Sequence, residues 1–543
     1  MLKKLSVIIL LAFVGFSTLG QTGSGEVEEA EIVIRKDRKI TLPLATRNFE
    51  KIPQLPVSQA DSKQVYKFKN FDYSLSPLEP SFRTVNYSNQ AVLRALTSNY
   101  VKVGYGNFGT PYLESYLGSK KSESYLFNLY VRHRSSRNGP VFDENSGNGL
   151  TEAAVGGKFF NGNNTISGSM NYEHQRVHFY GYNPVLSLER EDIEQTFSKI
   201  SANFGIEKTA NDEELDYHFK TDWSFFRDNF AASENKFYFD IGIGYQLSDE
   251  LRISLRSDAV LSNREDATEV NRNFLNLEPR LTYNGNGFQI SGGINYSGDN
   301  EAAGLNIYPA IRGTFSLASN LSIYGGYEGG VEMNTVESSI AELPFLQANF
   351  DLRNTEKKSD IFGGVTVSLT DELRLNSGAS LATLTNLAFY TNSVSDSTRF
   401  NALYDTGDTD RLNIFSELNY ENQGNIRSSL RFDFYNYSLS SLTEAWHRPD
   451  FKMSLNNTFF PVENLTVTAD LYYVGGLVAQ NGETTQVIEL DDILDLNIGA
   501  RYQFNDRFGV FLQTNNLFGT EYQRYLNYVS RGLQLLGGLS ISF

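Results

Sequence analysis

The chain has 543 residues, no cysteine and a formal net charge of −17, which excludes disulfides, thiol catalysis and a lipid-anchored N-terminal cysteine and disfavours a nucleic-acid partner. It is rich in tyrosine, phenylalanine and glycine (31, 39 and 44 residues) and poor in proline (13), a composition that favours β-strands. Its mean hydropathy of −0.35 fits a water-soluble protein, but it equally fits a transmembrane β-barrel, in which only every second residue faces lipid.

The first 20 residues have the organisation of a signal peptide. Lys3 and Lys4 precede an apolar run at 5–16, and a stretch of mostly small residues ends at Gly20. The run is shorter than the roughly 20 apolar residues that a membrane-spanning helix needs. We therefore expect export through the Sec pathway and cleavage between Gly20 and Gln21.

Residues 21–98 differ from the rest of the chain, because they show little alternation and mix both charges with scattered prolines. This composition predicts an extended segment that either stays in the periplasm or threads into a lumen. A short strand within it could also be lent to the sheet of a partner protein.

From residue 99 onward the sequence repeats strands of alternating polarity. In residues 237–247, one face carries Phe237, Phe239, Ile241, Ile243, Tyr245 and Leu247, and the other carries Tyr238, Asp240, Gly242, Gly244 and Gln246. The same two-residue period recurs at 251–259, 288–296, 465–473 and 496–504. Each of these segments is a strand with one apolar and one polar face.

Short turns and long connections alternate between these strands. The short turns lie at 161–164, 248–250, 284–287, 318–320, 370–372, 461–464 and 505–506. The long polar connections lie at 135–148, 181–192, 334–356, 439–448 and 519–530. The hairpin at 107–109 and the kinked stretch 399–420 fit the pattern least well. An outer-membrane barrel has short periplasmic turns and long outer loops, so residues 99–543 predict an all-β, closed antiparallel barrel of about 22 strands.

A soluble set of sandwiches or a propeller also has alternating strands. Strands of ten or more residues exceed the five or six that are usual in soluble sheets, which favours the barrel. The partner of its outer face is then the lipid bilayer of the outer membrane of a Gram-negative bacterium.

The last strand has Leu535, Leu539, Ile541 and Phe543 on one face. With its terminal aromatic residue, it resembles the sorting strand that the barrel-assembly machinery recognises in outer-membrane proteins. Together with Asn515-Asn516-Leu517-Phe518-Gly519-Thr520-Glu521-Tyr522, it looks like the last hairpin of TonB-dependent receptors. The resemblance covers the barrel part of that family and implies energised uptake of a scarce nutrient.

The chain departs from this family at its N-terminal side, because residues 21–98 leave no room for the family's globular plug. The N-terminal segment, infolded loops such as 334–356, or a partner protein must then occupy the wide lumen. Glu31, Ile32, Val33 and Ile34 are similar to the family's energy-coupling box, which binds a periplasmic energy-coupling protein. Such a short match is common by chance.

Candidate metal sites and catalytic sites are weak. His174 and His178 lie about 13 Å apart along a strand, too far to share one ion. Asp405, Asp408 and Asp410 lack the spacing and the closing glutamate of an EF-hand loop. No nucleophile motif accompanies the histidines. We predict no cofactor, no metal and no catalytic residue.

Inward-facing charges are expected to pair with each other across strands. They are Arg252, Arg256, Arg431 and Arg501 with Asp240, Asp258, Asp433 and Asp470.

Two functions remain open. One is uptake or passage of a nutrient across the outer membrane. The other is a non-transporting barrel that serves as a subunit of a larger assembly with other outer-membrane proteins, for which residues 21–98 would be a docking arm. A barrel enzyme would need a catalytic cluster that the sequence does not contain.

Overall fold

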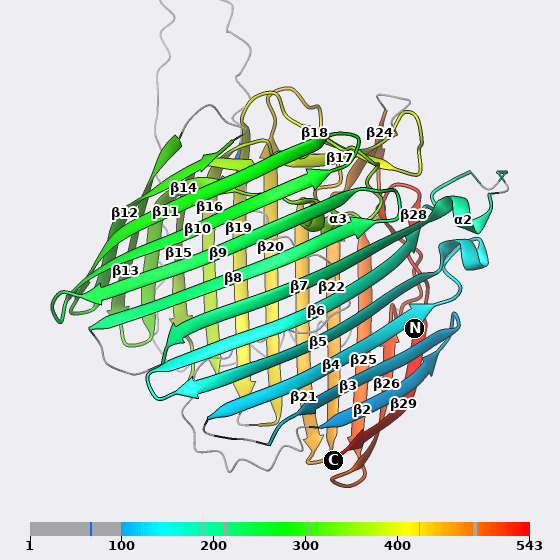
Figure 1. The fold of residues 1–543 in the computed structure, drawn as a ribbon, viewed down its shortest axis with the longest axis horizontal. Helices are drawn as coiled ribbons and strands as arrows, with labels where there is room; N and C mark the ends of the chain where they lie inside the picture. Colours follow the sequence, from blue (N-terminus) through cyan, green and yellow to red (C-terminus); the bar gives the residue numbers. More distant parts are fainter. Residues whose placement is uncertain are drawn as a thin grey trace, which may run out of the picture. The chain divides into compact units, whose positions relative to one another are not determined.

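The computed structural model describes residues 66–67 and 99–543, apart from 121, 123, 184, 187, 210–213, 301–304, 423 and 482–485. In this part of the chain, 22 strands form a closed antiparallel barrel (Figure 1), which confirms the predicted fold class. All described residues belong to one compact unit, Lys63–Phe543. The predicted signal peptide with Gly20 and Gln21, and nearly all of residues 21–98, lie outside the described residues.

The barrel strands follow one another around the wall in chain order. They are β2 (Tyr100–Gly106), β3 (Thr110–Gly118), β4 (Tyr125–Ser136), β5 (Asn148–Asn161), β6 (Asn164–His178), β7 (Glu194–Lys208), β8 (Leu215–Asp228), β9 (Ser233–Gln246), β10 (Leu251–Glu265), β11 (Glu269–Gly285), β12 (Phe288–Asp299), β13 (Leu305–Ala318), β14 (Leu321–Glu332), β15 (Thr355–Ser368), β16 (Leu373–Thr385), β19 (Thr409–Asn422), β20 (Ile426–Ser438), β21 (Phe451–Val462), β22 (Leu465–Gly475), β25 (Ile493–Gln503), β26 (Phe508–Asn515) and β29 (Gln534–Ser542).

The first and last strands close the barrel. β2 pairs antiparallel with β29, from Tyr100 opposite Ser542 to Gly106 opposite Leu536. The N–H of Phe543 donates to the carbonyl of Asn99 at 3.0 Å. The barrel therefore begins and ends at one rim, which we call the turn rim, and the opposite rim is the loop rim. A two-residue strand, β1 (Tyr66–Lys67), pairs in parallel with part of β19.

Turn chemistry fixes the connections at the turn rim, and the predicted short turns lie there. Residues 286–287, for example, join β11 to β12, and Gly287 adopts a φ of +80° that a side chain would disfavour. At the loop rim, three residues, 107–109, join β2 to β3, and Phe108 and Gly109 adopt φ values of +59° and +61°. The paired strands β2 and β3 confirm the hairpin that the sequence predicts at 107–109.

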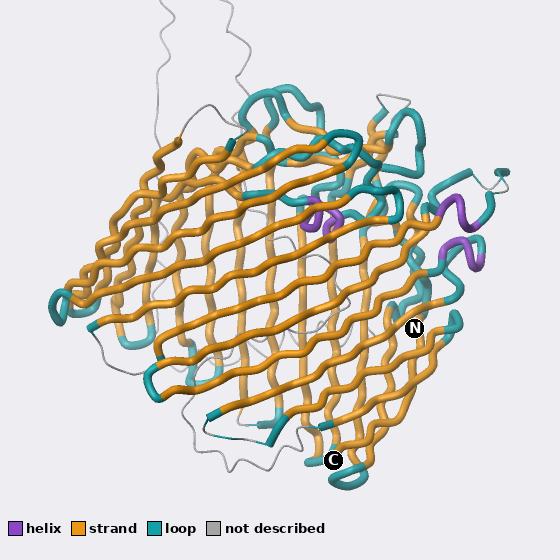
Figure 2. The backbone as a smooth tube through the Cα atoms, viewed as in Figure 1, coloured by secondary structure: helices purple, strands orange, loops and turns teal. Residues whose placement is uncertain are grey.

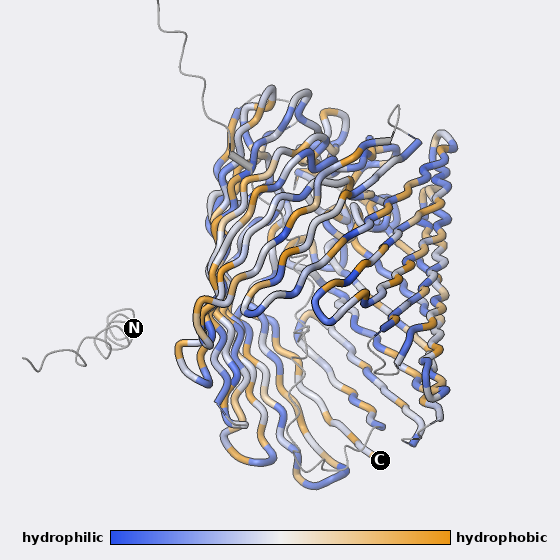
Figure 3. Tube along the Cα trace, turned by 90° about the vertical axis from the view of Figure 1, so that its left-hand side faces the viewer, coloured by the Kyte–Doolittle hydropathy of each residue, from blue (hydrophilic) through white to orange (hydrophobic). Residues whose placement is uncertain are grey.

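The two faces of the wall have the polarity that the sequence predicts. On β9, Phe237, Ile241, Ile243 and Tyr245 point outward and are exposed, while Gly242 and Gly244 are buried. Orange and blue alternate along the strands of the wall in Figure 3. The exposed apolar band is the surface that a bilayer would cover.

The loop rim carries the long connections and the small elements (Figure 2). These elements are η1 (Asp143–Ser146), α2 (Arg190–Ile193), α3 (Val336–Glu342), β17 (Ala388–Asn392), β18 (Phe400–Tyr404), β23 (Val478–Gln480), β24 (Val487–Glu489), β27 (Gln523–Tyr525) and β28 (Tyr528–Val529). Among the described residues, no helix has the length and apolar character needed to cross a membrane.

Two further long connections, 386–408 and 476–492, were not predicted from the sequence. Each contains a small hairpin, β17–β18 or β23–β24, whose strands of three to five residues imitate the alternation of the wall. The stretch 399–420 consequently divides between β18 in a loop and β19 in the wall.

Candidate functional site

The outer part of the lumen, next to the loop rim, is filled by loops that fold inward. The main one is residues 333–354, which contain helix α3 between β14 and β15. Thr335 caps this helix: its hydroxyl accepts from the N–H of Ser338 at 3.0 Å, and the Ser338 hydroxyl accepts from the N–H of Thr335 at 2.9 Å. The seven-residue helix is too short to be stable alone, so packing must hold it.

Apolar side chains of this loop form a core with other loops and with the barrel wall. They are Val336, Ile340, Leu343, Leu346, Phe350 and Leu352, packed with Tyr390, Phe400, Tyr525 and Tyr528 of other loops. Val177, Phe197 and Phe226 of β6, β7 and β8 belong to the same core. Leu343 and Phe400 are completely buried. We call the inward-folded loops 333–354, 386–408, 439–450 and 523–529 the loop plug. The sequence analysis named 334–356 as one candidate for filling the lumen, and these contacts agree with that hypothesis.

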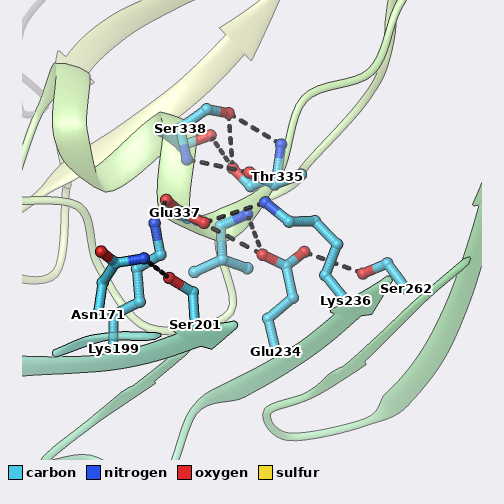
Figure 4. A network of polar contacts seen from close by, with 11 residues as sticks. Asn171, Lys199, Ser201, Glu234, Lys236, Ser262, Thr335, Glu337 and Ser338 are labelled. Carbon is cyan, nitrogen blue, oxygen red and sulfur yellow. Dashed lines mark hydrogen bonds and ion pairs between the residues drawn. The ribbon is translucent and has the colours of Figure 1, made fainter. Parts of the chain in front are cut away.

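Polar contacts attach α3 to the barrel wall (Figure 4). Glu337 forms ion pairs with Lys199 of β7 and with Lys236 of β9, the latter at 3.0 Å. The buried carboxylate of Glu234 on β9 accepts from the N–H of Val336 at 3.1 Å and from the hydroxyl of Ser262 at 3.2 Å. Burial would raise the pKa of Glu337, but the two lysines outweigh it and hold this pKa below its usual value.

Two arginines of the wall hold the ends of the same loop. Arg272 of β11 donates to the carbonyl of Asn334 and, at 2.8 Å, to the side chain of Asn354. Arg264 of β10 donates to the carbonyl of Phe350 at 3.1 Å, and its guanidinium lies 4.8 Å from the centre of the Phe350 ring. Both arginines are buried, and such charge-assisted bonds are stronger than neutral ones.

A second attachment joins the loop 439–450 to its neighbours. His447 is buried, its Nδ1 lies 2.7 Å from the carbonyl of Tyr390, and its Nε2 accepts from the N–H of Leu526 at 3.2 Å. These two bonds require a neutral imidazole that is protonated on Nδ1. Burial, together with Arg524 and Arg448, lowers the pKa of His447 to about 4. Arg448 in turn forms an ion pair with Glu342 at the end of α3, at 2.7 Å.

Asp405, a candidate calcium ligand in the sequence, ties two loops together instead. Its carboxylate accepts from the N–H of Ser441 at 2.7 Å, and further N–H groups of residues 440–442 also donate to it. Burial raises the pKa of Asp405, but these hydrogen bonds lower it by more, so the pKa lies below its usual value and the group stays ionised. Asp408 forms an ion pair with Lys358 at 2.6 Å. Among the described residues, no group of three or more His, Cys, Asp or Glu could hold a metal ion.

The two histidines considered as metal ligands, His174 and His178, have separate partners. His174 Nδ1 lies 3.0 Å from the hydroxyl of Ser198, whereas the fully buried His178 contacts the carbonyl of Gly147 at 2.6 Å and accepts from Arg190 at 3.2 Å. These bonds give each ring a structural role.

The expected pairing of inward charges across strands holds in part. Arg256 of β10 lies 3.5 Å from Asp240 of β9, whereas Arg431 binds Asp433 of its own strand, β20, at 2.7 Å. Arg252 of β10 pairs across β9 with Asp216 of β8, a residue that was not among the charges predicted to pair.

Three of the proposed sorting residues, Leu535, Leu539 and Ile541, are exposed on the outward face of β29. Phe543, directly after this strand, is also exposed. The proposed energy-coupling box, Glu31, Ile32, Val33 and Ile34, lies outside the described residues.

Sequence reasoning missed the residues that hold the loop plug, among them Glu234, Arg264, Arg272 and His447. One signal was available: residues 336–352 contain too many large apolar side chains for a loop exposed to water.

Two cavities border the loop plug. The larger, about 680 Å³, lies at the loop rim between strands β10–β14 and residues 349–354. The smaller, about 350 Å³, lies between α3 and the side chains of β11–β15 and β19.

No protein-family model and no curated protein matches the chain in sequence. Solved structures do match its fold. They include the FrpB iron transporter from Neisseria meningitidis (TM-score 0.63, 10% identity, 82% of this chain and 82% of that chain) and the siderophore receptor PirA from Acinetobacter baumannii (0.62, 10%, 82% and 80%). The ferric-catecholate import receptor Fiu from E. coli K12 matches similarly (0.61, 10%, 82% and 82%).

The chain has the barrel fold of TonB-dependent receptors. At about 10% identity, this likeness concerns the fold alone. These neighbours are named as receptors and transporters. Within this fold, the described residues contain loops, rather than a separate globular domain, in the outer part of the lumen.

Proposed function

We propose that this protein is an outer-membrane barrel for the uptake or passage of a nutrient, and that the loop plug is its gate. The attachment of residues 333–354 carries this proposal. The apolar side of the loop shares a core with other loops and with Val177, Phe197 and Phe226 of the wall strands β6, β7 and β8. Its polar attachments to the wall are ion pairs and hydrogen bonds through Glu337, Arg264 and Arg272. Such polar contacts can be exchanged for water or ligand groups at modest net cost, which suits a closure that must open.

The wide barrel supports the same function. A barrel of about 22 strands encloses a lumen that can admit a solute much larger than an ion once the filling segments move. Receptors and transporters with this barrel fold move iron compounds, according to their names. The solute of the present chain is a separate question, because the shared fold does not determine it.

The ends of the chain would serve export, assembly and energy coupling. Residues 1–20 would be removed between Gly20 and Gln21 after Sec export. The barrel-assembly machinery would recognise the strand that ends at Phe543. Residues 21–98 would remain as an extended arm that stays in the periplasm or threads into the lumen, and Glu31 to Ile34 would bind a periplasmic energy-coupling protein.

The second candidate is a non-transporting subunit of a larger outer-membrane assembly. One observation favours it: Leu343, Phe389 and Phe400 in the loop plug are completely buried, as in the core of a permanently folded domain. A barrel closed in this way would act as a platform rather than as a passage.

Purification of the tagged full chain from its own membranes in mild detergent separates these functions. We expect a solitary barrel, or one that retains a periplasmic energy-coupling protein. Outer-membrane or surface proteins present in constant stoichiometric amount would contradict passage and support the assembly subunit.

A further inference from the structure

The larger cavity at the loop rim has the construction of a ligand site. Its volume, about 680 Å³, lies within the range of roughly 300–1,000 Å³ that is typical of small-molecule sites. One wall consists of residues of β10–β15, and the other is the end of the loop 333–354, at residues 349–354. The site is therefore shared between the rigid barrel and the segment that we propose as its gate.

The lining is dominated by planar polar side chains. They are the arginines Arg264, Arg272 and Arg353, the carboxylates Asp266, Asp299, Asp351 and Glu356, and the amides Asn306, Asn349, Asn354 and Asn386. Phe350, Leu352, Val270 and Val331 add apolar surface. Such a lining offers many donors and acceptors side by side.

The charged groups of this lining, three arginines and four carboxylates, carry a net charge of only −1, and most of them already have partners within the protein. Arg264 pairs with Asp266 at 3.3 Å, and Arg353 pairs with Asp351 at 2.6 Å. Asp299 accepts from the side chain of Asn354 at 2.7 Å. A strongly charged ligand would have to break these pairs, so the lining favours a neutral ligand.

A neutral ligand for this lining needs many groups that both donate and accept. Hydroxyl groups do so, and neighbouring hydroxyls match the paired donors or acceptors of arginine, carboxylate and amide groups. We propose that this cavity binds a short neutral oligosaccharide. The ligand contacts Asn306 and Asp299 on the wall together with Asn349 and Asn354 on the loop, so its binding reports the position of the loop plug. Only this link to gating rests on the proposed function.

Binding is tested on the full chain in detergent, by isothermal titration calorimetry with neutral trisaccharides (maltotriose, cellotriose, laminaritriose, mannotriose and chitotriose). Neutral tripeptides of similar size form the comparison set. We expect saturable binding of at least one trisaccharide. Binding of tripeptides alone, or no binding of any trisaccharide, would overturn the proposal. Passage is not measured, so a failure of the proposed gate would leave this result unaffected.

Two matched variants test whether the ligand binds in this cavity. Val270 lines the cavity without a polar contact to the loop plug, and Val270→Trp should fill part of the space and weaken trisaccharide binding at least tenfold. Ile307→Trp adds the same ring on the outward face of β13, a strand of the same part of the wall, and should leave binding unchanged. If Val270→Trp does not yield a heat-modifiable barrel, Asn306→Leu replaces it with the same expected loss. Unaltered binding in a folded cavity variant would also overturn the proposal.

Discussion

Acidification should loosen the attachment of the His447 loop, because the bonds of His447 require a neutral ring. The ordinary histidine pKa of 6.5 applies to the unfolded or open loop, and the pKa in the closed loop is about 4. Since the closed state lowers the pKa, its stabilisation is complete above pH 6.5 and is lost as the pH falls toward 4. At pH 5 the loss is about 2 kcal/mol, which corresponds to a roughly 30-fold increase in local opening.

Hydrogen exchange with mass spectrometry measures this opening. In peptides that cover 386–404 and 523–529, protection corrected for intrinsic exchange should fall by about this factor between pH 7.5 and pH 5. In the variant His447→Gln, the protection of the same peptides should no longer depend on pH. Constant protection of the unmodified protein, or an equal decrease in the variant, would refute the role assigned to His447.

Three further changes test other parts of the account. Ile241→Lys, on the lipid face of β9, should cost about 2–4 kcal/mol in urea unfolding from bilayers, whereas inward Asp240→Asn should cost far less; equal costs would contradict the assigned faces. Phe543→Asp should reduce the heat-modifiable barrel found in outer membranes, and a normal amount would contradict the sorting role. Glu337→Gln leaves Lys199 and Lys236 without their carboxylate and should lower the free energy of local opening of residues 333–354 by about 1–3 kcal/mol, so that added protease cleaves this loop faster. Unchanged cleavage would show that these ion pairs do not hold α3.

The wall of the barrel could be predicted because each strand and each short turn is specified by neighbouring residues in the sequence. A two-residue period assigns Ile241 outward and Asp240 inward whatever the rest of the chain does, and a turn such as that at Gly287 fixes the register of the two strands it joins. The number of strands then follows from repeating this local pattern. It fails only where a hairpin such as β17–β18 imitates wall strands within a loop.

The loop plug could not be predicted in the same way, because its contacts join residues far apart in the sequence. Glu337 meets Lys199 across 138 positions, and Tyr180 donates to the carbonyl of Val529 across 349 positions. No local period encodes such pairs. The apolar content of 336–352 indicates that this loop is buried, but only the fold identifies Arg264, Arg272 and His447 as the residues that hold the loop plug.

The most direct test of the loop gate is the conductance of the full chain in planar bilayers. The side chain of Asn334 donates to the carbonyl of Arg353 at 2.8 Å, so the ends of the loop adjoin and residues 335–352 can be replaced by a short Gly-Ser linker. A control carries Val185→Ser and Leu186→Ser, two exposed residues of another outer loop.

We expect the unmodified protein and the control to be closed, and the linker variant to show large, long-lived openings. A linker variant as closed as the unmodified protein would contradict the loop gate and leave the lumen to be filled by another segment or by a partner.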